Sequence, residues 1–230
     1  MVRVPGKKML SDSLKRWLGG HQPPPGKESP PGEDSGPGVL RHSNGLGEFF
    51  LQLSQRRRLK VLDLGAASQA NINFITGLGQ TINHEDLYPE LAAYAYRVRL
   101  PEGGTGWDAG AFLEHNLKYP PALFDAVLCW EALDLLPDPA AAPQVVARLA
   151  QITKPGAPLL MFFHTAEPGK AVPVCHSQIC GLDSLRMFPR AQFRMKRPLN
   201  NRNIENLFRK FHALKFFLSR DHLREVLAVR

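Results

Sequence analysis

Residues 61–87 decide the fold of this chain, and they read VLDLGAASQANINFITGLGQTINHEDL. A short apolar strand is expected over residues 59–64, and a turn of small residues follows it. Apolar side chains at helical spacing predict a helix over residues 70–79. A second strand, over residues 81–86, ends in acidic side chains. This order of strand, small-residue turn, helix and strand predicts the first unit of a parallel sheet.

The rest of the chain continues the alternation of helices and strands. Helices are expected over residues 46–55, 91–98, 140–152 and 201–211, and strands over residues 124–130, 158–164, 214–219 and 226–230. Residues 165–199 are predicted to be irregular. Continuous apolar strands indicate a sheet that is covered on both faces, and the two closing strands imply an antiparallel pair at one edge. The predicted fold class is α/β, with a seven-stranded, mostly parallel sheet, helices on both faces and an antiparallel final strand.

Length and composition favour one domain with a tail. The chain has 230 residues, of which 43% are hydrophobic, enough for a core of ordinary size. Residues 1–18 are predicted to form a short amphipathic segment, residues 19–45 a flexible linker rich in Pro and Gly, and residues 46–230 the folded domain. The apolar runs are too short for a membrane span, and no secretory signal or disulfide framework is visible. A cytoplasmic location without membrane contact is expected.

The net charge of +8 is unevenly distributed. Residues 1–58 and 186–230 carry excesses of five and nine positive charges, whereas residues 59–185 carry an excess of six negative charges. Basic ends can favour acidic or phosphate-bearing partners, but a solvated charged surface is the preferred explanation. Five basic side chains in the irregular segment suggest recognition of an anionic substrate: Arg186, Arg190, Arg194, Lys196 and Arg197.

A ligand site is expected beyond the carboxyl ends of the parallel strands. The first strand is followed by Gly65, Ala66 and Ala67, whose small side chains let backbone N–H groups approach a ligand. Asp86 ends the second strand, where a carboxylate can accept hydrogen bonds from both hydroxyls of a ribose. Residues 129–131 follow the fourth predicted strand of the fold. Together these positions predict a nucleotide-type site.

These residues resemble the class I S-adenosylmethionine-dependent methyltransferases. Asp63, Gly65 and Asp86 fall on the first two motifs of that family, and residues 116–163 are similar to its stretch from the adenine-contacting loop to the fifth strand. The resemblance covers residues 46–230 except 165–200. It implies a Rossmann-like methyltransferase fold, S-adenosylmethionine as cofactor and transfer of a methyl group.

The resemblance also implies roles for single residues. Asp86 would hold the ribose, Asn116 would contact the adenine amino group, and Leu117 would pack on the adenine ring. Trp130 and Glu131 lie where substrate and cofactor meet in that family. The implied cofactor-binding residues are Asp63, Gly65, Ala66, Ala67, Asp86, Asn116, Leu117 and Cys129. No catalytic residue is assigned.

Two departures from the family pattern keep other functions open. Ala67 and Gln69 stand at the second and third glycines of the family's loop, and Gln69 is expected to enter the cofactor space. The leading interpretation is a methyltransferase that acts on an anionic or small-molecule substrate. The alternative is a catalytically inactive methyltransferase-like module that binds or regulates a partner. A nicotinamide-dependent oxidoreductase is less favoured because the loop lacks G-x-G-x-x-G.

The remaining motifs exclude little. Cys175, His176 and Cys180 lack a convincing fourth ligand, so no metal site is predicted. Residues 129–132 differ from the pattern of enzymes that methylate amino groups of bases, which makes nucleic acid possible but not favoured as a partner. Neither the methyl acceptor nor the oligomeric state follows from the sequence.

Overall fold

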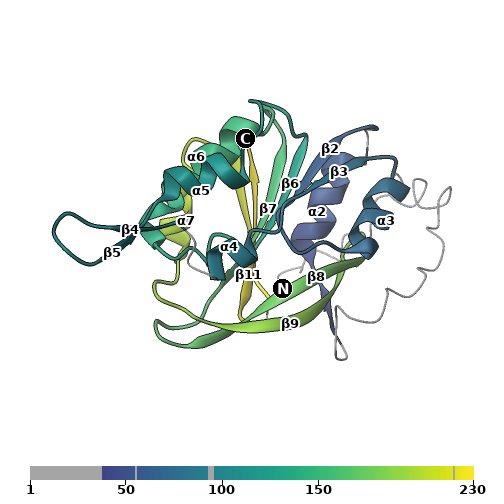
Figure 1. Cartoon of the computed structure of the whole chain (residues 1–230). Helices are drawn as coiled ribbons and strands as arrows, with labels where there is room; N and C mark the ends of the chain where they lie inside the picture. Colours follow the sequence, from purple (N-terminus) through teal and green to yellow (C-terminus); the bar gives the residue numbers. More distant parts are fainter. Residues whose placement is uncertain (1–37, 55, 93–95, 220) are drawn as a thin grey trace, which may run out of the picture.

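The computed structural model describes residues 38–54, 56–92, 96–219 and 221–230, and the first two predicted segments lie largely outside them. Its main sheet has the strand order β10-β11-β7-β6-β2-β3 (Figure 1). The six strands are β2 (Lys60–Asp63), β3 (Thr81–His84), β6 (Ala126–Trp130), β7 (Pro158–His164), β10 (Ala213–Phe217) and β11 (Leu223–Val229). The strands β3, β2, β6 and β7 are parallel, whereas β11 and β10 run antiparallel.

Helices cover both faces of this sheet. They are α2 (Asn44–Leu53), α3 (Gln69–Gly77), α4 (Tyr88–Ala92), α5 (Ala109–Asn116), α6 (Ala142–Ile152) and α7 (Asn201–Leu207), with a 3-10 turn, η1 (Pro139–Ala141), before α6. Figure 1 shows α5, α6 and α7 on one side of the sheet and α2 and α3 on the other. The predicted α/β class is therefore confirmed.

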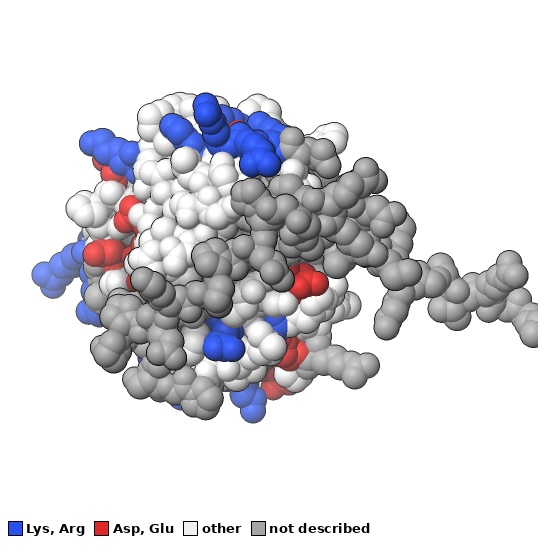
Figure 2. All heavy atoms as spheres, turned by 90° about the vertical axis from the view of Figure 1, so that its right-hand side faces the viewer, with Lys and Arg blue, Asp and Glu red and all other residues white. Residues whose placement is uncertain are grey.

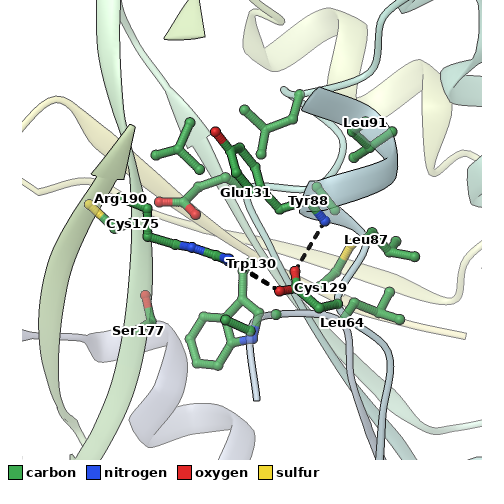
Figure 3. A pocket seen from close by; sticks show the side chains of 16 residues that line it. Leu64, Leu87, Tyr88, Leu91, Cys129, Trp130, Glu131, Cys175, Ser177 and Arg190 are labelled. Carbon is green, nitrogen blue, oxygen red and sulfur yellow. Dashed lines mark hydrogen bonds and ion pairs between the residues drawn. The ribbon is translucent and has the colours of Figure 1, made fainter. Parts of the chain in front are cut away.

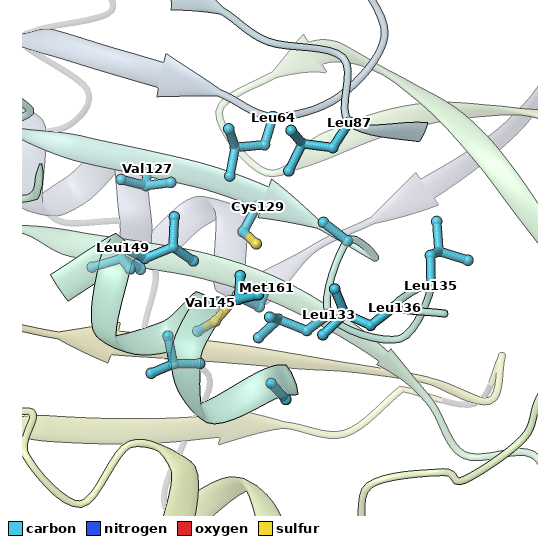
Figure 4. Packing of buried hydrophobic residues seen from close by; sticks show 14 of the residues in the cluster. Leu64, Leu87, Val127, Cys129, Leu133, Leu135, Leu136, Val145, Leu149 and Met161 are labelled. Atoms are coloured by element: carbon cyan, nitrogen blue, oxygen red, sulfur yellow. The ribbon is translucent and has the colours of Figure 1, made fainter. Parts of the chain in front are cut away.

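The alternation of side chains along β7 divides the core into two clusters. Leu159, Met161 and Phe163 pack with α5, α6 and α7, and Leu160 and Phe162 pack with α2. All of them are fully buried, because successive side chains of a strand point to opposite faces. Figure 4 shows the first cluster, in which Met161 lies near Val145 and Leu149 of α6. A strand that is buried on both faces reads as a continuous apolar run, which is why β7 could be predicted to the residue.

Among the residues that the structure describes, the main sheet has six strands and not the predicted seven, and three of its five strand pairs are parallel. Where the family's third strand is expected, β4 (Arg97–Arg99) and β5 (Thr105–Trp107) instead form a separate two-stranded hairpin. All three side chains of β4 are exposed. A strand with so few apolar residues gains little by joining a buried parallel sheet.

A second sheet replaces the predicted irregular segment. Its strands are β8 (Ala171–Gly181), β9 (Ser184–Arg194) and β1 (Val39–His42), in the order β1-β9-β8. Residues 39–42 thus belong to a strand, although they were expected to end a flexible linker. Figure 1 shows β8 and β9 crossing the end of the main sheet at which its parallel strands finish. The predicted ligand site lies beneath this second sheet.

Ion pairs of a buried arginine connect the second sheet to the main sheet. Arg41 of β1 is buried and contacts Asp221 and Glu225, which ties the second sheet to β11. Figure 2 shows Lys and Arg side chains gathered at the top of one face, toward the end of the sheet at which the parallel strands begin. Among the residues that the structure describes, no helix has the length and apolar character that a membrane crossing requires.

Candidate functional site

Asp63 organises the loop after β2 from a fully buried position. Its Oδ1 accepts hydrogen bonds from the Gly65 backbone N–H at 3.1 Å and from Trp130 Nε1 at 2.6 Å, and its Oδ2 accepts one from Asn71 Nδ2 at 3.2 Å. Burial raises the pKa of the Asp63 carboxyl, although these hydrogen bonds and His84 act in the opposite direction. The carboxyl is held by contacts within the protein, and Asp63 is not among the residues that line the nearby small pocket described below.

Gly65 is required by the close approach of Trp130. A Cβ atom on Gly65 would lie 2.7 Å from Trp130 Cδ1 and 2.8 Å from its Nε1, which is too close for any other residue. Trp130 itself has a φ of 50°, a left-handed conformation that bulky residues rarely adopt. Such strained residues concentrate at functional sites. The indole ring of Trp130 thus lies against the loop after β2, in the space where the sequence resemblance places a cofactor.

The small pocket, a cavity of about 30 Å³ at the ends of β2, β3 and β6, brings six of the predicted residues together (Figure 3). These residues are Gly65, Ala66, Asp86, Cys129, Trp130 and Glu131. Ser177 and Arg190, from the second sheet, form its other wall. Pockets for small ligands are usually ~300 Å³ or larger. The small pocket must therefore widen before it can admit a nucleotide.

Arg190 closes the small pocket by contacting Asp86. Both Nη atoms of Arg190 donate to Asp86 Oδ2 at 3.3 Å, and the guanidinium lies 4.8 Å from the ring centroid of Tyr88. The other oxygen of Asp86 accepts a hydrogen bond from the Tyr88 backbone N–H at 3.1 Å. The Arg190 side chain is 31% exposed, so it has solvent on one side. A partly exposed arginine can swing away without unfolding the sheet that carries it.

Asn71 joins helix α3 to strand β8. Its Nδ2 donates to the Ser177 carbonyl at 3.1 Å, and its Oδ1 accepts from the Ile179 backbone N–H at 2.7 Å. The side-chain amide thus pairs with β8 as a neighbouring strand would. Because the same Nδ2 also reaches Asp63, Asn71 links the loop after β2 to the second sheet above it.

Besides Asp63, three more predicted cofactor residues lie outside the small pocket. Ala67 is exposed, and Leu117 is fully buried in the core. Asn116 is also buried, and its Nδ2 donates to Tyr96 Oη and to the Phe112 carbonyl. The expectation that Gln69 enters the cofactor space is wrong. Gln69 is the first residue of α3, and its side chain donates to Asn73 on the outside of that helix.

Glu131 is the buried carboxyl of this region that has an unpaired oxygen facing two cavities. It is 3% exposed, and its Oε1 has no hydrogen-bond partner among the residues that the structure describes. Burial raises the pKa of Glu131 to about 7; the charge of His164 acts to lower it, and the charge of Asp134 acts to raise it further. In Figure 3 its carboxyl group lies on the side of the small pocket that holds Arg190 and Cys175.

His164 and Asp134 form a buried pair next to Glu131. Asp134 Oδ2 accepts from the His164 backbone N–H at 2.6 Å and lies 3.2 Å from its Nδ1. Burial acts to lower the pKa of His164, but the hydrogen bond and charge of Asp134 outweigh it and raise the pKa.

The two cysteines of this region are not activated. Burial raises the pKa of the Cys129 and Cys175 thiols to about 12, so neither is an activated nucleophile at neutral pH.

The large pocket, a cavity of about 700 Å³, lies on the other side of Glu131. Its walls come from the ends of β7 and β11, the loop after β7 and the second sheet, and both Glu131 and Cys175 line it as well as the small pocket. This volume falls within the ~300–1,000 Å³ of typical small-molecule sites. The large pocket could not be predicted from the sequence because most of its walls belong to the segment that was expected to be irregular.

The five basic residues of that segment do not form one anion-binding cluster. Arg190 is paired with Asp86, Arg194 donates to the Gly169 carbonyl, and Lys196 donates to the Pro137 carbonyl. Arg186 and Arg197 are exposed. The alternating apolar residues Val172 and Val174 are the sequence signal that would have indicated a strand in this segment.

The fold and the site together define an α/β domain with an acidic residue, Asp86, at the edge of the small pocket. No family model matches the chain. One segment is 36% identical over 107 residues to a ubiquinone biosynthesis O-methyltransferase of Thiobacillus denitrificans, covering 46% of this chain and 44% of that protein. A similar segment is 35% identical over 103 residues to the enzyme of the same name from Xylella fastidiosa strain M23, covering 44% of this chain and 40% of the relative.

The resemblance to methyltransferases is confirmed by these relatives, although the matched segment spans less than half of each relative. Among solved structures, a SAM-dependent methyltransferase from Archaeoglobus fulgidus has a TM-score of 0.48 at 11% sequence identity, covering 80% of this chain and 91% of that one. Nothing about function follows from so distant a likeness.

Proposed function

We propose that this chain is an S-adenosylmethionine-dependent methyltransferase that acts on a hydroxyl group of a small molecule. The observation that carries the proposal is the position of Asp86 at the end of β3, facing a pocket that Gly65 and Ala66 of the neighbouring strand also line. The names of the curated relatives, all O-methyltransferases, support oxygen as the methyl acceptor.

The residues of the small pocket fit the chemistry of this cofactor. The Asp86 carboxylate would hold the ribose hydroxyls, and the backbone of Gly65 and Ala66 would face the methionine part. Leu87 and Leu91 add apolar surface that suits a base. The small pocket becomes large enough for the cofactor only after Arg190 has moved away from Asp86. The partial exposure of the Arg190 side chain makes that movement possible. Cofactor binding therefore competes with an internal ion pair.

The chain would promote methyl transfer through position and charge. When bound, S-adenosylmethionine supplies a methyl group on a positively charged sulfur. Carboxylates near this site, Asp86 and Glu131, are suited to a positively charged ligand. The second sheet covers the pocket and excludes water, which keeps the reacting groups in fixed positions. No covalent intermediate with the protein is needed.

The size of the small pocket favours a second candidate function. With Trp130 beside Gly65 and Arg190 on Asp86, the pocket of about 30 Å³ is also what a non-catalytic, methyltransferase-like binding module would show. Such a module would use its surface and the second sheet rather than a cofactor. The two candidates differ in whether the small pocket opens for S-adenosylmethionine.

Thermal unfolding with S-adenosylmethionine, S-adenosylhomocysteine or NAD separates these candidates. A ligand at ~100 times its Kd stabilises a protein by ~2.7 kcal/mol, which raises the Tm of a domain of this size by about 5–10 °C. The methyltransferase proposal predicts this shift with the two sulfur ligands, its loss in Asp86→Ala and its retention in Glu90→Ala. No shift with millimolar sulfur ligand would favour the binding module, and a shift with NAD alone would favour an oxidoreductase.

A further inference from the structure

A groove between α6 and α7 lies apart from the small pocket and the large pocket. Its cavity has a volume of about 420 Å³ and is lined by residues from 139–150 and 197–211. The two helices lie on the same side of the main sheet (Figure 1) and contact each other. Among the residues that the structure describes, none lines both this α6–α7 groove and either pocket. A ligand in the groove would therefore leave both pockets free.

The floor of the α6–α7 groove is apolar. Val146 of α6 is buried beneath it, and Leu199, Leu207 and Phe211 are half-buried around it. The side of α6 that faces the groove carries small side chains, among them Ala147. Small side chains on one helix and larger ones on the other leave the space that the cavity occupies. Because water still reaches this apolar surface, its burial by the apolar part of a ligand would be favourable.

Three cations surround the apolar floor. Arg197 precedes α7, whereas Arg209 and Lys210 follow it, so basic side chains lie at both ends of this helix. All three are exposed, and none of them forms an ion pair within the part of the chain that the structure describes. The described residues that line the groove include no Asp or Glu. An apolar floor with cations and no acid is complementary to an anion that has an apolar body.

The stability of α7 does not explain the position of Arg197. A cation is stabilising near the C-terminus of a helix and not near its N-terminus. Arg209 and Lys210 follow the last turn of α7 and gain from this effect, but Arg197 lies before the helix and gains nothing from it. A bound anion gives Arg197 a partner of opposite charge.

The volume of the groove favours a small molecule as its occupant. Sites for small molecules have volumes of ~300–1,000 Å³, and a cavity of about 420 Å³ lies within this range. Such sites combine a mostly apolar lining with a few polar groups that orient the ligand. The basic side chains of the rim supply these groups in the α6–α7 groove.

We propose that the α6–α7 groove binds a small amphipathic anion, which is an aromatic or aliphatic molecule with one carboxylate, sulfonate or phosphate group. The apolar body of this molecule would lie against Val146, Leu207 and Phe211. Its anionic group would pair with the cations at one end of α7. The proposal does not depend on the proposed function, because neither S-adenosylmethionine nor a residue of the small pocket takes part in it.

Two fluorescent probes with the same apolar body test the site. The probe 8-anilinonaphthalene-1-sulfonate carries one sulfonate group, and N-phenyl-1-naphthylamine lacks it. Titration of the protein with each probe at pH 7, followed by the rise in probe fluorescence, gives the two Kd values. Wild type is expected to bind the sulfonate probe. Failure of wild type to bind it would overturn the small-molecule site in favour of a protein partner in the groove.

A pair of tryptophan variants tests the location of the bound probe. Ala147 is exposed on α6 and lines the groove, so Ala147→Trp should fill the cavity. The lost apolar contacts should weaken binding of both probes by roughly tenfold or more. Ala171→Trp, which places the same side chain in the large pocket, is the matched control and should retain this binding. Unchanged binding by Ala147→Trp would overturn the groove as the site.

The triple variant Arg197→Gln, Arg209→Gln and Lys210→Gln tests the role of the cations. It should weaken the sulfonate probe by about fivefold, as expected for the loss of a partly exposed ion pair, and leave the Kd of the neutral probe unchanged. A matched control removes three exposed arginines outside the groove and changes the net charge equally: Arg57, Arg99 and Arg186. The control should bind both probes as wild type does. Equal weakening of the sulfonate probe by the two triple variants, or by neither, would overturn anion recognition in the groove.

Discussion

Arg190 and Asp86 lie 104 residues apart in the sequence and meet at the mouth of the small pocket, with Nη1 of Arg190 3.3 Å from Oδ2 of Asp86. The carboxylate belongs to the end of the main sheet, and the guanidinium belongs to the second sheet that covers it. This ion pair therefore occupies the group that is proposed to hold the cofactor's ribose. Removal of Arg190 is therefore expected to strengthen cofactor binding, whereas removal of Asp86 is expected to abolish it.

The first prediction is that Arg190→Ala binds S-adenosylmethionine more tightly than wild type. Partly exposed ion pairs are worth ~0.2–1 kcal/mol, so release of Asp86 should improve the Kd by up to about fivefold. Isothermal titration calorimetry measures this change directly. Arg186→Ala, which removes an exposed arginine from the same strand, should bind as wild type does. Weaker binding by Arg190→Ala would mean that Arg190 helps to hold the ligand.

The second prediction concerns the hydrogen bond from Trp130 to Asp63. Trp130→Phe keeps most of the ring but removes the Nε1–H donor, which lies 2.6 Å from a fully buried carboxyl. A buried acceptor that loses a partner destabilises the fold by ~1–3 kcal/mol, so the free energy of unfolding in urea should fall by about that amount.

A double-mutant cycle with Asp63→Asn isolates this hydrogen bond. If the two side chains act together, Trp130→Phe should destabilise Asp63→Asn less than it destabilises wild type. Equal effects in both backgrounds would show that loss of ring packing, for example on Phe162, explains the whole change.

The central strands could be predicted from the sequence because burial leaves a simple pattern. β7 and β6 are apolar on both faces, and the turn at Lys154-Pro155-Gly156 separates α6 from β7. Asp86 could likewise be placed near a ligand site, since the ends of parallel strands meet at one edge. The local sequence therefore contains both the pattern of the buried strands and the position of Asp86 at the end of one of them.

The second sheet could not be predicted so readily. Strand β8 contains Pro173 and a register shift between Val174 and Cys175, and both interrupt the alternation that would identify a strand. The contacts between Arg190 and Asp86 and between Asn71 and β8 depend on how this sheet lies across the main one. The spacing of residues along the chain does not encode these contacts. For this reason Gln69 was expected beside the cofactor, whereas Arg190 and Trp130 are the side chains that line the small pocket.

The third prediction is that Asn71→Ala loosens β8 from α3. The side chain makes hydrogen bonds to Asp63, the Ser177 carbonyl and the Ile179 N–H from a position that is 1% exposed. Removing it leaves buried groups unpaired and should destabilise the protein by about 2–4 kcal/mol, since each such group is worth ~1–3 kcal/mol.

Hydrogen exchange distinguishes this local effect from a general one. The Ile179 amide should lose protection in Asn71→Ala by more than amides of β7 lose. Asn73→Ala, which removes only an exposed hydrogen bond with Gln69, serves as the control and should change neither. Uniform loss of protection across β7 and β8 would contradict a specific link between Asn71 and β8.

The fourth prediction is that Glu131→Gln stabilises the protein at high pH but not at low pH. Burial raises the pKa of Glu131 from 4.5 to about 7. Below about pH 4.5 the carboxyl is protonated in both the folded and the unfolded chain, so it makes no difference to stability. Between about pH 4.5 and 7 the folded state keeps a proton that the unfolded state has lost. The free energy of unfolding therefore falls as the pH rises, and the loss is complete above about pH 7.

Glutamine cannot ionise, so Glu131→Gln escapes this loss. The shift of the pKa from 4.5 to about 7, at ~1.36 kcal/mol per pKa unit, corresponds to about 3 kcal/mol at pH 8. The variant should therefore be more stable than wild type by about that amount, and its Tm should be higher by about 6–12 °C. At pH 4.5 the two Tm values should nearly coincide, because glutamine has the shape of the protonated acid. Titration of His164, whose pKa is also raised, occurs in both proteins and largely cancels in the comparison. A Tm difference that is the same at both pH values would show that Glu131 does not ionise near neutral pH, and that burial therefore does not raise its pKa as far as neutrality.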